Sequence, residues 1–199
     1  MSFGKEKKYR LSYSDMFEIK GQLDCEGMKI LHPSREINSC YFDTPSQRMY
    51  SESEEGILPR KKIRVRWYGE LKNYTKETKI SSVEGRFKYS SPMDSLTKDD
   101  CPNSLQFFEK DYGLLVPTLV VSYEREYYLL HNMRITFDRN IKYTDLRFSS
   151  KPTFRDSECV MEIKVPIDCG EDYIETFIQY ATSRFSKYSR GMLYGDKMM

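Results

Sequence analysis

Basic residues alternate along one predicted strand of this 199-residue chain. Successive side chains of a strand point to opposite faces, so residues at every second position share a face. The basic set is Arg60, Lys62, Arg64 and Arg66. Ile63, Val65 and Trp67 lie on the opposite face with Lys61 and are typical of a buried side. Guanidinium forks and ammonium groups both suit phosphate oxygens, so the basic face predicts anion binding.

Charged residues recur at the same spacing in other strand-like segments. One such pair alone is explained as a solvated strand face or a cross-strand ion pair. Five segments together favour a polar interior, and Glu162 and Lys164 are the most unusual because apolar residues flank them on both sides. The segments contain Glu6 and Lys8; Glu77 and Lys79; Tyr123 and Arg125; Arg134, Thr136 and Asp138; and Glu162 and Lys164.

Short segments rich in Val, Ile, Tyr, Phe and Arg must position these side chains, and their composition predicts β-strands. We expect strands at 37–42, 61–68, 76–80, 86–89, 119–130, 133–137 and 159–165, with a two-residue turn at His131–Asn132. Apolar spacing predicts a helix over 14–25 behind a Ser14/Asp15 cap, a short helix over 105–112 and a longer helix over 171–185. The region 90–103 is expected to be a connection or small lobe.

A closed antiparallel barrel with a charged interior satisfies this pattern, because interior and exterior residues alternate along each of its strands. The acids expected inside are Glu6, Glu77, Asp138 and Glu162. The basic residues expected inside are Lys8, Arg60, Lys62, Arg64, Arg66, Lys79, Arg125, Arg134, Lys164 and Lys187. An interior with this excess of basic groups predicts a polyanionic ligand. The carboxylates predict Mg²⁺ or Mn²⁺ bridging to its phosphates.

Composition excludes several classes of protein. The formal net charge is only +2, which argues against a polycation that coats nucleic acid, and the 14% aromatic content argues against a disordered chain. No apolar run is long enough to span a membrane, and no signal peptide is apparent. Five widely spaced cysteines indicate reduced cytosolic thiols, and no P-loop, Rossmann or zinc motif occurs. We expect a single domain over residues 1–199.

Several motifs, in order and over nearly the whole chain, resemble the VTC (vacuolar transporter chaperone) domain of the triphosphate tunnel metalloenzymes. The resemblance implies an eight-stranded closed antiparallel tunnel of the α+β, mainly antiparallel β class, with a few flanking helices and a C-terminal helix at the tunnel. The motifs are Glu6-Lys7-Lys8-Tyr9, Tyr41-Phe42-Asp43-Thr44-Pro45, Arg60 to Gly69, Glu77-Thr78-Lys79, Ser122 to Arg125, Arg134 to Asp138, Met161 to Lys164 and Phe185 to Met192.

The resemblance also implies site roles, residue by residue. Glu162 corresponds to the metal-binding glutamate, and Glu6 and Glu77 are further candidate metal ligands. The expected catalytic residues are Arg64, Arg66, Glu162 and Lys187. The expected substrate ligands are Lys8, Arg60, Lys62, Arg64, Arg66, Lys79, Arg125, Arg134, Lys164 and Lys187. Arg86 or Lys88 is another candidate base, but the sequence alone leaves their register open.

The implied activity is metal-dependent phosphoryl transfer on triphosphate or polyphosphate, with polyphosphate synthesis from ATP as the leading reaction. The alternatives are hydrolysis of tripolyphosphate or a nucleoside triphosphate, and a non-catalytic polyphosphate-binding module. The carboxylates Glu6, Glu77 and Glu162 favour catalysis over pure binding. No specific nucleic acid is expected. A cytoplasmic location is expected, and the resemblance admits a separate membrane protein as a partner.

Three residues carry competing interpretations. Asp43 and Thr44 are expected to cap a turn where a strand ends before Pro45, and a catalytic role for Asp43 is the alternative. Asp138 is either a structural partner of Arg134 or Arg139 or a ligand of metal or water. Lys187, together with Arg190, is either a tunnel base or a cation that stabilises the C-terminal end of a helix.

Overall fold

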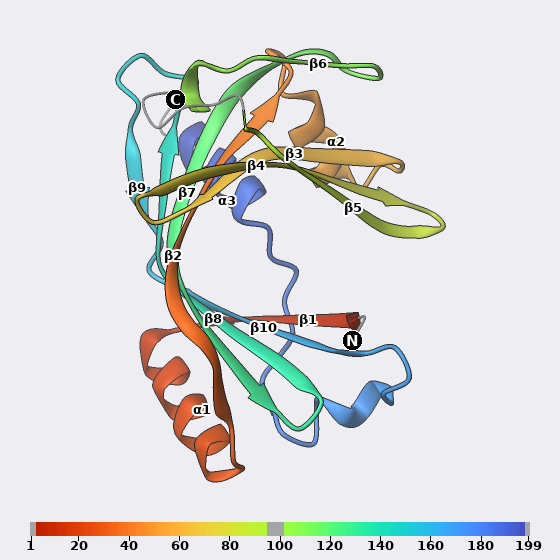
Figure 1. Ribbon diagram of the computed structural model, residues 1–199, viewed down its shortest axis with the longest axis vertical. Helices are drawn as coiled ribbons and strands as arrows, with labels where there is room; N and C mark the ends of the chain where they lie inside the picture. Colours follow the sequence, from red (N-terminus) through yellow and green to blue (C-terminus); the bar gives the residue numbers. More distant parts are fainter. Residues whose placement is uncertain (1–2, 95–101, 198–199) are drawn as a thin grey trace. The chain divides into compact units, whose positions relative to one another are not determined.

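A computed structural model describes residues 3–94 and 102–197, and its main feature is one antiparallel sheet (Figure 1). Its principal strand order is β1-β10-β8-β7-β2-β3-β4-β5, while β6 pairs with β7 and β9 pairs with β8. The strands are β1 (Phe3–Leu11), β2 (Lys29–Asp43), β3 (Arg60–Tyr68), β4 (Leu71–Ser82), β5 (Gly85–Pro92), β6 (Phe107–Glu109), β7 (Gly113–Leu130), β8 (Met133–Asp145), β9 (Thr153–Arg155) and β10 (Cys159–Pro166).

Each predicted strand lies within one of these elements, and the mainly antiparallel β class is confirmed. Eight strands form the principal order, as expected. The expectation of a closed barrel is overstated, because the order is linear. It begins with β1 and ends with β5, and no hydrogen-bonded ladder among the described residues joins those two strands.

In the described part of the chain, three α-helices and two short 3-10 helices accompany the sheet. They are α1 (Tyr13–Cys25), α2 (Arg48–Glu55), α3 (Lys187–Asp196), η1 (Pro102–Ser104) and η2 (Glu171–Tyr173). No helix in the described part of the chain has the length and apolarity needed to cross a membrane.

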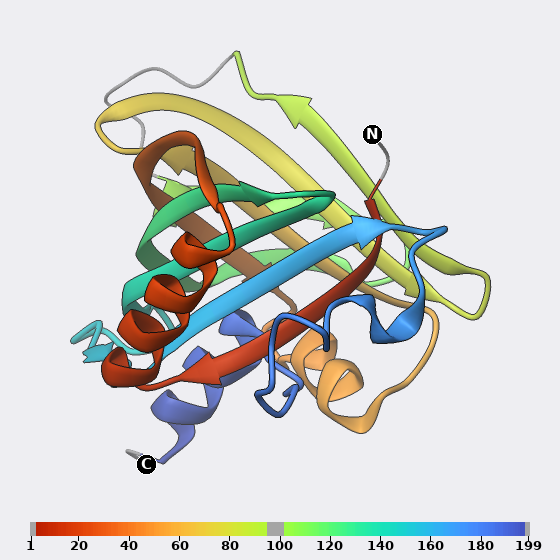
Figure 2. The same ribbon diagram turned by 90° about the horizontal axis from the view of Figure 1, so that it is seen from below.

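The chain divides into two compact units, and β2, β7 and β8 pass through both. The first unit contains residues 1–36, 123–141 and 155–185; the second contains 37–122, 142–154 and 186–199. In the first unit, α1 packs across β1 and β10 (Figure 2). Met16, Ile19 and Leu23 of the helix join Tyr9 and Ile163 in its buried core. The opposite faces of β1 and β10 therefore remain available for polar residues.

The core of the second unit lies between one face of β3 and helix α2. Ile63 and Val65 are buried there with Cys40, Phe42 and Met49. Because side chains alternate, burying Ile63 and Val65 turns the basic residues of β3 to the other face, as predicted. The apolar core thus determines the orientation of the basic set.

One expectation about α1 needs adjustment. The helix forms as predicted, but its N-cap is Ser12 rather than Ser14 or Asp15. The Ser12 hydroxyl accepts from the Asp15 amide, and Asp15 in turn accepts from the Ser12 amide, which makes a capping box.

The prediction of a helix over 171–185 is wrong. Only the 3-10 turn η2 forms, although Ile174 and Ile178 are buried in the core as their spacing suggested. The chain beyond them instead bonds to strand β1. The Ser183 amide donates to the Lys8 carbonyl at 2.8 Å, and the Arg10 amide donates to the Ser183 hydroxyl at 3.2 Å. These tertiary hydrogen bonds satisfy backbone groups of an outer strand and override local helix propensity.

The prediction of a helix over 105–112 is also wrong, and α2 was not foreseen. Phe107 pairs with Leu115 in an antiparallel ladder and packs edge-on against Phe42, so the segment forms β6 and a turn. The start of α2 depends on a side chain at the end of β2, since the Asp43 carboxylate accepts from the Met49 and Tyr50 amides. Part of the expected 90–103 connection, residues 95–101, lies outside the described residues.

Candidate functional site

Two lysines and two glutamates form an alternating cluster on β1 and β10 in the first unit. The strand register places Glu6 opposite Lys164 and Lys8 opposite Glu162. Lys8 Nζ lies 2.9 Å from Glu6 and 3.7 Å from Glu162, while Lys164 Nζ lies 3.2 Å from Glu6 and 3.0 Å from Glu162. Each carboxylate therefore contacts both ammonium groups. We name these four residues the acid–lysine cluster.

The electrostatics of this cluster keep both carboxylates ionised. Burial raises the pKa of Glu162, but Lys8, Lys164 and Arg125 lower it by more, so the net pKa lies far below its usual value. The pKa of Glu6 is also lowered, because the two lysines outweigh burial and the repulsion from Glu162. Burial lowers the pKa of Lys164, but its two glutamate partners raise it above the ordinary value. The cluster carries two full charges of each sign.

Strand β8 extends the same polar face with Arg134, which lies opposite Lys164 in register. Arg125 on β7 donates through Nε and Nη2 to both oxygens of Asp138, at 2.5 and 2.6 Å. Asp138 is almost completely buried, and this bidentate pair gives it a structural partner. That partner is Arg125, which the sequence analysis had not considered as the partner of Asp138.

A second, strongly basic face covers β3, β4 and β5 in the second unit. Lys62, Lys79 and Lys88 stand opposite one another across the three strands. Arg60 and Arg86 flank this row on one side because Ser81 pairs with both of them, and Arg64 and Arg66 follow along β3 on the other. The register shows that Arg86 and Lys88 both belong to this face, which we call the basic face. Its members are Arg60, Lys62, Arg64, Arg66, Lys79, Arg86 and Lys88.

Glu77 lies on the same side of the sheet as these seven basic residues, and it is the carboxylate among the described side chains there. Three cations surround it. Arg64 approaches Oε2 through Nε at 2.7 Å and Nη2 at 2.6 Å. Lys88 Nζ lies 2.6 Å from Oε1, and Arg66 Nη1 lies 3.7 Å from the same oxygen. Burial raises the pKa of Glu77, but the three cations lower it by more, so the net pKa is about 2.

Helix α3 begins beside this face, at residues from the far end of the chain. Lys62 donates to the hydroxyl of Ser186 at 3.0 Å, and Ser186 caps α3 by accepting from the Ser189 amide. Lys187 is the first residue of the helix, so it sits at the positive end of the helix dipole. The interpretation of Lys187 and Arg190 as stabilising a helix C-terminus is therefore wrong.

Tyr41 contacts both β3 and helix α3, a role that the sequence analysis did not predict. Its hydroxyl accepts from Arg64 at 2.9 Å, and its ring stacks on Tyr188 of α3 with centroids 4.9 Å apart. Burial raises the pKa of the Tyr41 phenol, but Arg64, Arg66 and Lys187 lower it to a value below the ordinary one. The position thus favours negative charge.

Asp43 has a structural role consistent with its expected place at a strand end. β2 ends at this residue, and its carboxylate accepts from the Thr44 amide at 2.7 Å and from the Tyr188 hydroxyl at 2.6 Å. Together with its bonds to α2, these contacts place Asp43 between two helices. It is completely buried, which argues against contact with a substrate.

The predicted site residues thus fall into two groups, one in each unit. The first group is Glu6, Lys8, Arg125, Arg134, Glu162 and Lys164. The second is Arg60, Lys62, Arg64, Arg66, Glu77, Lys79 and Lys187. Of the three candidate metal ligands, Glu6 and Glu162 share two lysine partners, while Glu77 belongs to the other unit. In residues 3–94 and 102–197, no three His, Cys, Asp or Glu side chains gather as a metal-binding group.

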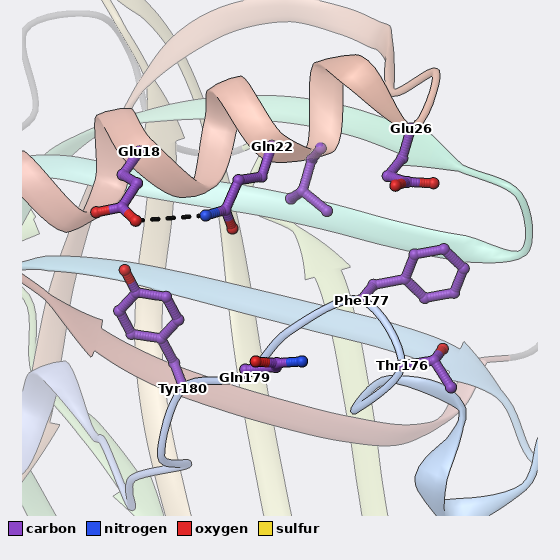
Figure 3. A pocket seen from close by; sticks show the side chains of 8 residues that line it. Glu18, Gln22, Glu26, Thr176, Phe177, Gln179 and Tyr180 are labelled. Carbon is purple, nitrogen blue, oxygen red and sulfur yellow. Dashed lines mark hydrogen bonds between the residues drawn. The ribbon is translucent and has the colours of Figure 1, made fainter.

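A groove of about 540 Å³ lies elsewhere in the first unit, between α1 and the segment after η2 (Figure 3). Glu18 and Gln22 of α1 and Glu26, the residue after the helix, face Phe177 and Tyr180 across it. None of its eight lining residues is basic. The groove therefore has the wrong charge to bind phosphate.

Solved structures share this fold at low sequence identity. A candidate adenylate cyclase of Vibrio parahaemolyticus is 14% identical with a TM-score of 0.53, and the match covers 96% of this chain and 98% of that one. A candidate adenylate cyclase of Bacillus halodurans gives 12% and 0.58 with the same coverage. A Hippeastrum protein described as a candidate adenylyl cyclase with dominant triphosphatase activity gives 13% and 0.56, over 95% of both chains.

Comparison of sequences gives the family itself. No curated protein sequence matches the chain. A family model does: the model of the VTC domain matches residues 3–194, which is nearly the entire length. This match includes both the acid–lysine cluster and the basic face, and the chain belongs to the VTC domain family.

Proposed function

We propose that this protein binds triphosphate or polyphosphate and catalyses metal-dependent phosphoryl transfer, with polyphosphate synthesis from ATP as its reaction. The observation that carries the proposal is the basic face, where seven arginines and lysines share one side of β3, β4 and β5 with Glu77 as the carboxylate among the described residues. Like charges directly opposite one another destabilise a sheet. A row of three facing lysines is therefore expected where a polyanion offsets the repulsion.

The chemistry of these donors favours phosphate over other anions. Arg64 and Arg66 present planar forks, which match pairs of phosphate oxygens, and the lysines supply point charges beside them. The α3 N-terminus with Lys187 adds a favourable dipole next to Lys62. Membership in the VTC domain family supports the same class of ligand.

The acid–lysine cluster fits a divalent cation shared with substrate. Mg²⁺ is commonly held through one or two carboxylates plus substrate phosphates, and Glu6 and Glu162 supply two ionised carboxylates that face the same pair of lysines. Mn²⁺ suits the same oxygen donors. A bound ion there would neutralise charge on phosphate oxygens. Lys8 and Lys164, which now hold the carboxylates, would then be available to bind phosphate.

The proposed reaction requires positioning more than a protein nucleophile. The bond between the γ-phosphorus of ATP and its bridging oxygen breaks, a bond forms to a terminal oxygen of polyphosphate, and ADP leaves. We propose that Arg64 and Arg66 bind the equatorial oxygens of the transferring group and that Lys187 binds a neighbouring phosphate. Arg125, fixed by Asp138, would hold phosphate through the guanidinium N–H groups that do not bond to that carboxylate.

Hydrolysis is the second candidate, in which water replaces the polyphosphate oxygen as acceptor. The Hippeastrum structure of the same fold, which is described as having dominant triphosphatase activity, favours this alternative. A non-catalytic polyphosphate-binding module is the third. ATP as phosphate donor, a cytoplasmic location and a separate membrane protein partner remain predictions from the family resemblance.

One experiment separates these three functions. The purified protein is incubated with ATP and Mn²⁺, with and without a short polyphosphate primer, and the products are resolved by chain length on a gel. Glu162→Ala is the matched control. A ladder that disappears in the variant supports the polymerase, and free phosphate without a ladder supports the hydrolase. Undiminished metal-dependent turnover by Glu162→Ala would contradict the role assigned to that residue.

Binding without turnover would favour the third candidate. Polyphosphate that raises the melting temperature of the wild type, while neither a ladder nor free phosphate forms, indicates a binding module. No product and no thermal shift would overturn the proposed function altogether.

A further inference from the structure

We infer that Glu77 is a positioning residue for the phosphate-binding cations and not a ligand of the metal. The inference rests on the proposed function and assigns this carboxylate a different role from Glu6 and Glu162. Its basis is the arrangement of Arg64, Arg66 and Lys88 around one buried side chain.

Both oxygens of Glu77 are already occupied by cations from neighbouring strands. Oε2 accepts two guanidinium hydrogens of Arg64, and Oε1 is in contact with Lys88 at 2.6 Å. A divalent cation would have to displace these positive groups and enter a surrounding of the same sign. Three cations face this one carboxylate, whereas two lysines face two carboxylates in the acid–lysine cluster. A divalent cation at Glu77 would therefore enter a surrounding with a net positive charge, which is electrostatically unfavourable in a partly desolvated region.

The neighbours of Glu77 on the basic face provide no second carboxylate. Along β4 the adjacent positions of the same face are Thr75 and Lys79, and across the sheet Glu77 pairs with Arg64 and Ser90. Among these neighbours, Glu77 is therefore the single carboxylate that could bind a hard divalent ion. In the acid–lysine cluster, by contrast, two carboxylates face the same pair of lysines.

The contacts instead show how Glu77 can direct the cations. Arg64 is held between the Glu77 carboxylate and the Tyr41 hydroxyl, through three different nitrogens. This double restraint fixes the plane of the guanidinium. Arg66 and Lys88 come from β3 and β5 toward the same carboxylate, which reduces their mutual repulsion before substrate arrives. Glu77 thereby preorganises the three cations, although its negative charge lowers the net positive charge of this face by one.

This role predicts that catalysis and affinity respond differently to loss of the charge. Glu77→Gln removes the carboxylate and makes the basic face more positive. Polyphosphate affinity measured in EDTA is expected to stay equal or become tighter. The value of kcat is expected to fall about 10- to 100-fold, because misplaced arginines no longer match the transferring group. The Mn²⁺ concentration that gives half-maximal activity is expected to remain unchanged.

A metal ligand would behave in the opposite way. Loss of such a ligand weakens metal affinity by about 10- to 100-fold, so a higher Mn²⁺ concentration would restore the turnover of Glu77→Gln. That result, or an unchanged kcat, would overturn the inference. The matched control is Glu109→Gln, which removes a carboxylate that pairs with Lys61, from the other face of β3. Its kcat and Mn²⁺ dependence should equal those of the wild type.

A conservative variant covers the case in which Glu77→Gln does not fold. Glu77→Asp keeps the charge but shortens the side chain, so it is expected to retain more kcat than Gln does, again at an unchanged Mn²⁺ midpoint. A raised midpoint for Glu77→Asp would contradict the inference. Failure of the proposed function has a different signature, since the wild type itself would then show neither turnover nor polyphosphate binding.

Discussion

Lys62 on β3 donates a hydrogen bond of 3.0 Å to Ser186, the residue that caps helix α3, across 124 positions of the chain. The contact joins a central member of the basic face to the helix that carries Lys187. Ser186 also accepts from the Ser189 amide, so one hydroxyl both caps the helix and anchors the lysine. Replacing this hydroxyl therefore affects helix stability and the position of Lys62 together.

Ser186→Ala is expected to lower the free energy of unfolding by about 1 kcal/mol, because the cap is lost. It is also expected to weaken polyphosphate binding, since Lys62 loses its partner. Urea denaturation and a binding titration measure the two effects. Ser14→Ala, an exposed position in the first turn of α1, is the matched control and should change neither quantity appreciably. Unchanged stability in Ser186→Ala would contradict the capping role.

Lys79→Met is expected to make the protein more stable and a poorer binder. Lys79 lies between Lys62 and Lys88 in the cross-strand row, so removing its charge relieves repulsion on both sides. Favourable cross-strand pairs contribute about 0.2–1 kcal/mol each, and like charges directly opposite one another are destabilising. Urea denaturation should show the gain at low salt, and the gain should shrink as salt screens the row.

The same variant tests the link between this repulsion and function. Polyphosphate should raise the melting temperature of Lys79→Met by less than it raises that of the wild type. A variant that is both less stable and equally responsive to polyphosphate would show that the row of lysines is not a phosphate site.

Acid should destabilise the protein in a pH window set by Glu77. The pKa of this carboxyl is about 2 in the folded protein, against 4.5 as its ordinary value. A carboxyl whose pKa is lower in the folded protein than in the unfolded chain stabilises the fold. This stabilisation is complete at pH values above the pKa of the unfolded chain, and it is lost as the pH falls toward the pKa of the folded protein. The loss attributable to Glu77 is expected between about pH 5 and pH 2 and amounts to at most about 3 kcal/mol.

Denaturant unfolding at a series of pH values measures this contribution. In Glu77→Gln the slope of unfolding free energy against pH should be shallower between pH 5 and pH 2, because one titrating carboxyl is gone. Glu162 and Glu6, whose pKa values are also lowered, remain and keep some slope. Identical slopes for variant and wild type would contradict the ion-pair geometry around Glu77.

Arg147 should be essential for docking the C-terminal half of α3. Its guanidinium donates to Asp145 at 2.7 Å, to Asp196 at 2.7 Å and to the Met192 carbonyl at 3.0 Å. Asp145 is completely buried, so Arg147→Met leaves an uncompensated charge. Loss of one partner of a buried ion pair costs about 3–5 kcal/mol. Thermal unfolding should show a large decrease in melting temperature.

A glycine in the same helix tests this packing independently. A Cβ at Gly195 would overlap Asp145 and Arg147, so Gly195→Ala is expected to lower the melting temperature despite the better helix propensity of alanine. Gly21→Ala is the matched control, because nothing lies within 4 Å of a Cβ at that position of α1. That variant should be as stable as the wild type or slightly more stable.

The sequence by itself predicted β2, β3, β4, β5, β7, β8 and β10 and the orientation of the charged faces, although it predicted a helix where β6 forms. Alternation has a period of two, so burying Ile63 and Val65 necessarily turns Arg64 and Arg66 to the other side. The same argument placed Glu162 with Lys164 and Glu6 with Lys8. These assignments needed only local geometry, which explains why every expected strand was found.

Elements that depend on distant partners could not be predicted in this way. Helix α2 begins where the Asp43 carboxylate accepts from its amides, and the segment around Ser183 follows β1 instead of continuing a helix. Local propensity contributes little at such positions compared with hydrogen bonds to the Asp43 side chain or to the strand β1.

Register also had to come from the tertiary structure. A shift of one residue would move every side chain of β5 to the opposite face, and nothing local in the sequence selects between the two arrangements. The ladder pairs Lys79 with Lys88, and this places Lys88 beside Glu77. The sequence alone therefore determined which residues alternate on a common face, whereas strand pairing decided which charges meet across it, because cross-strand hydrogen bonds form only in the folded sheet.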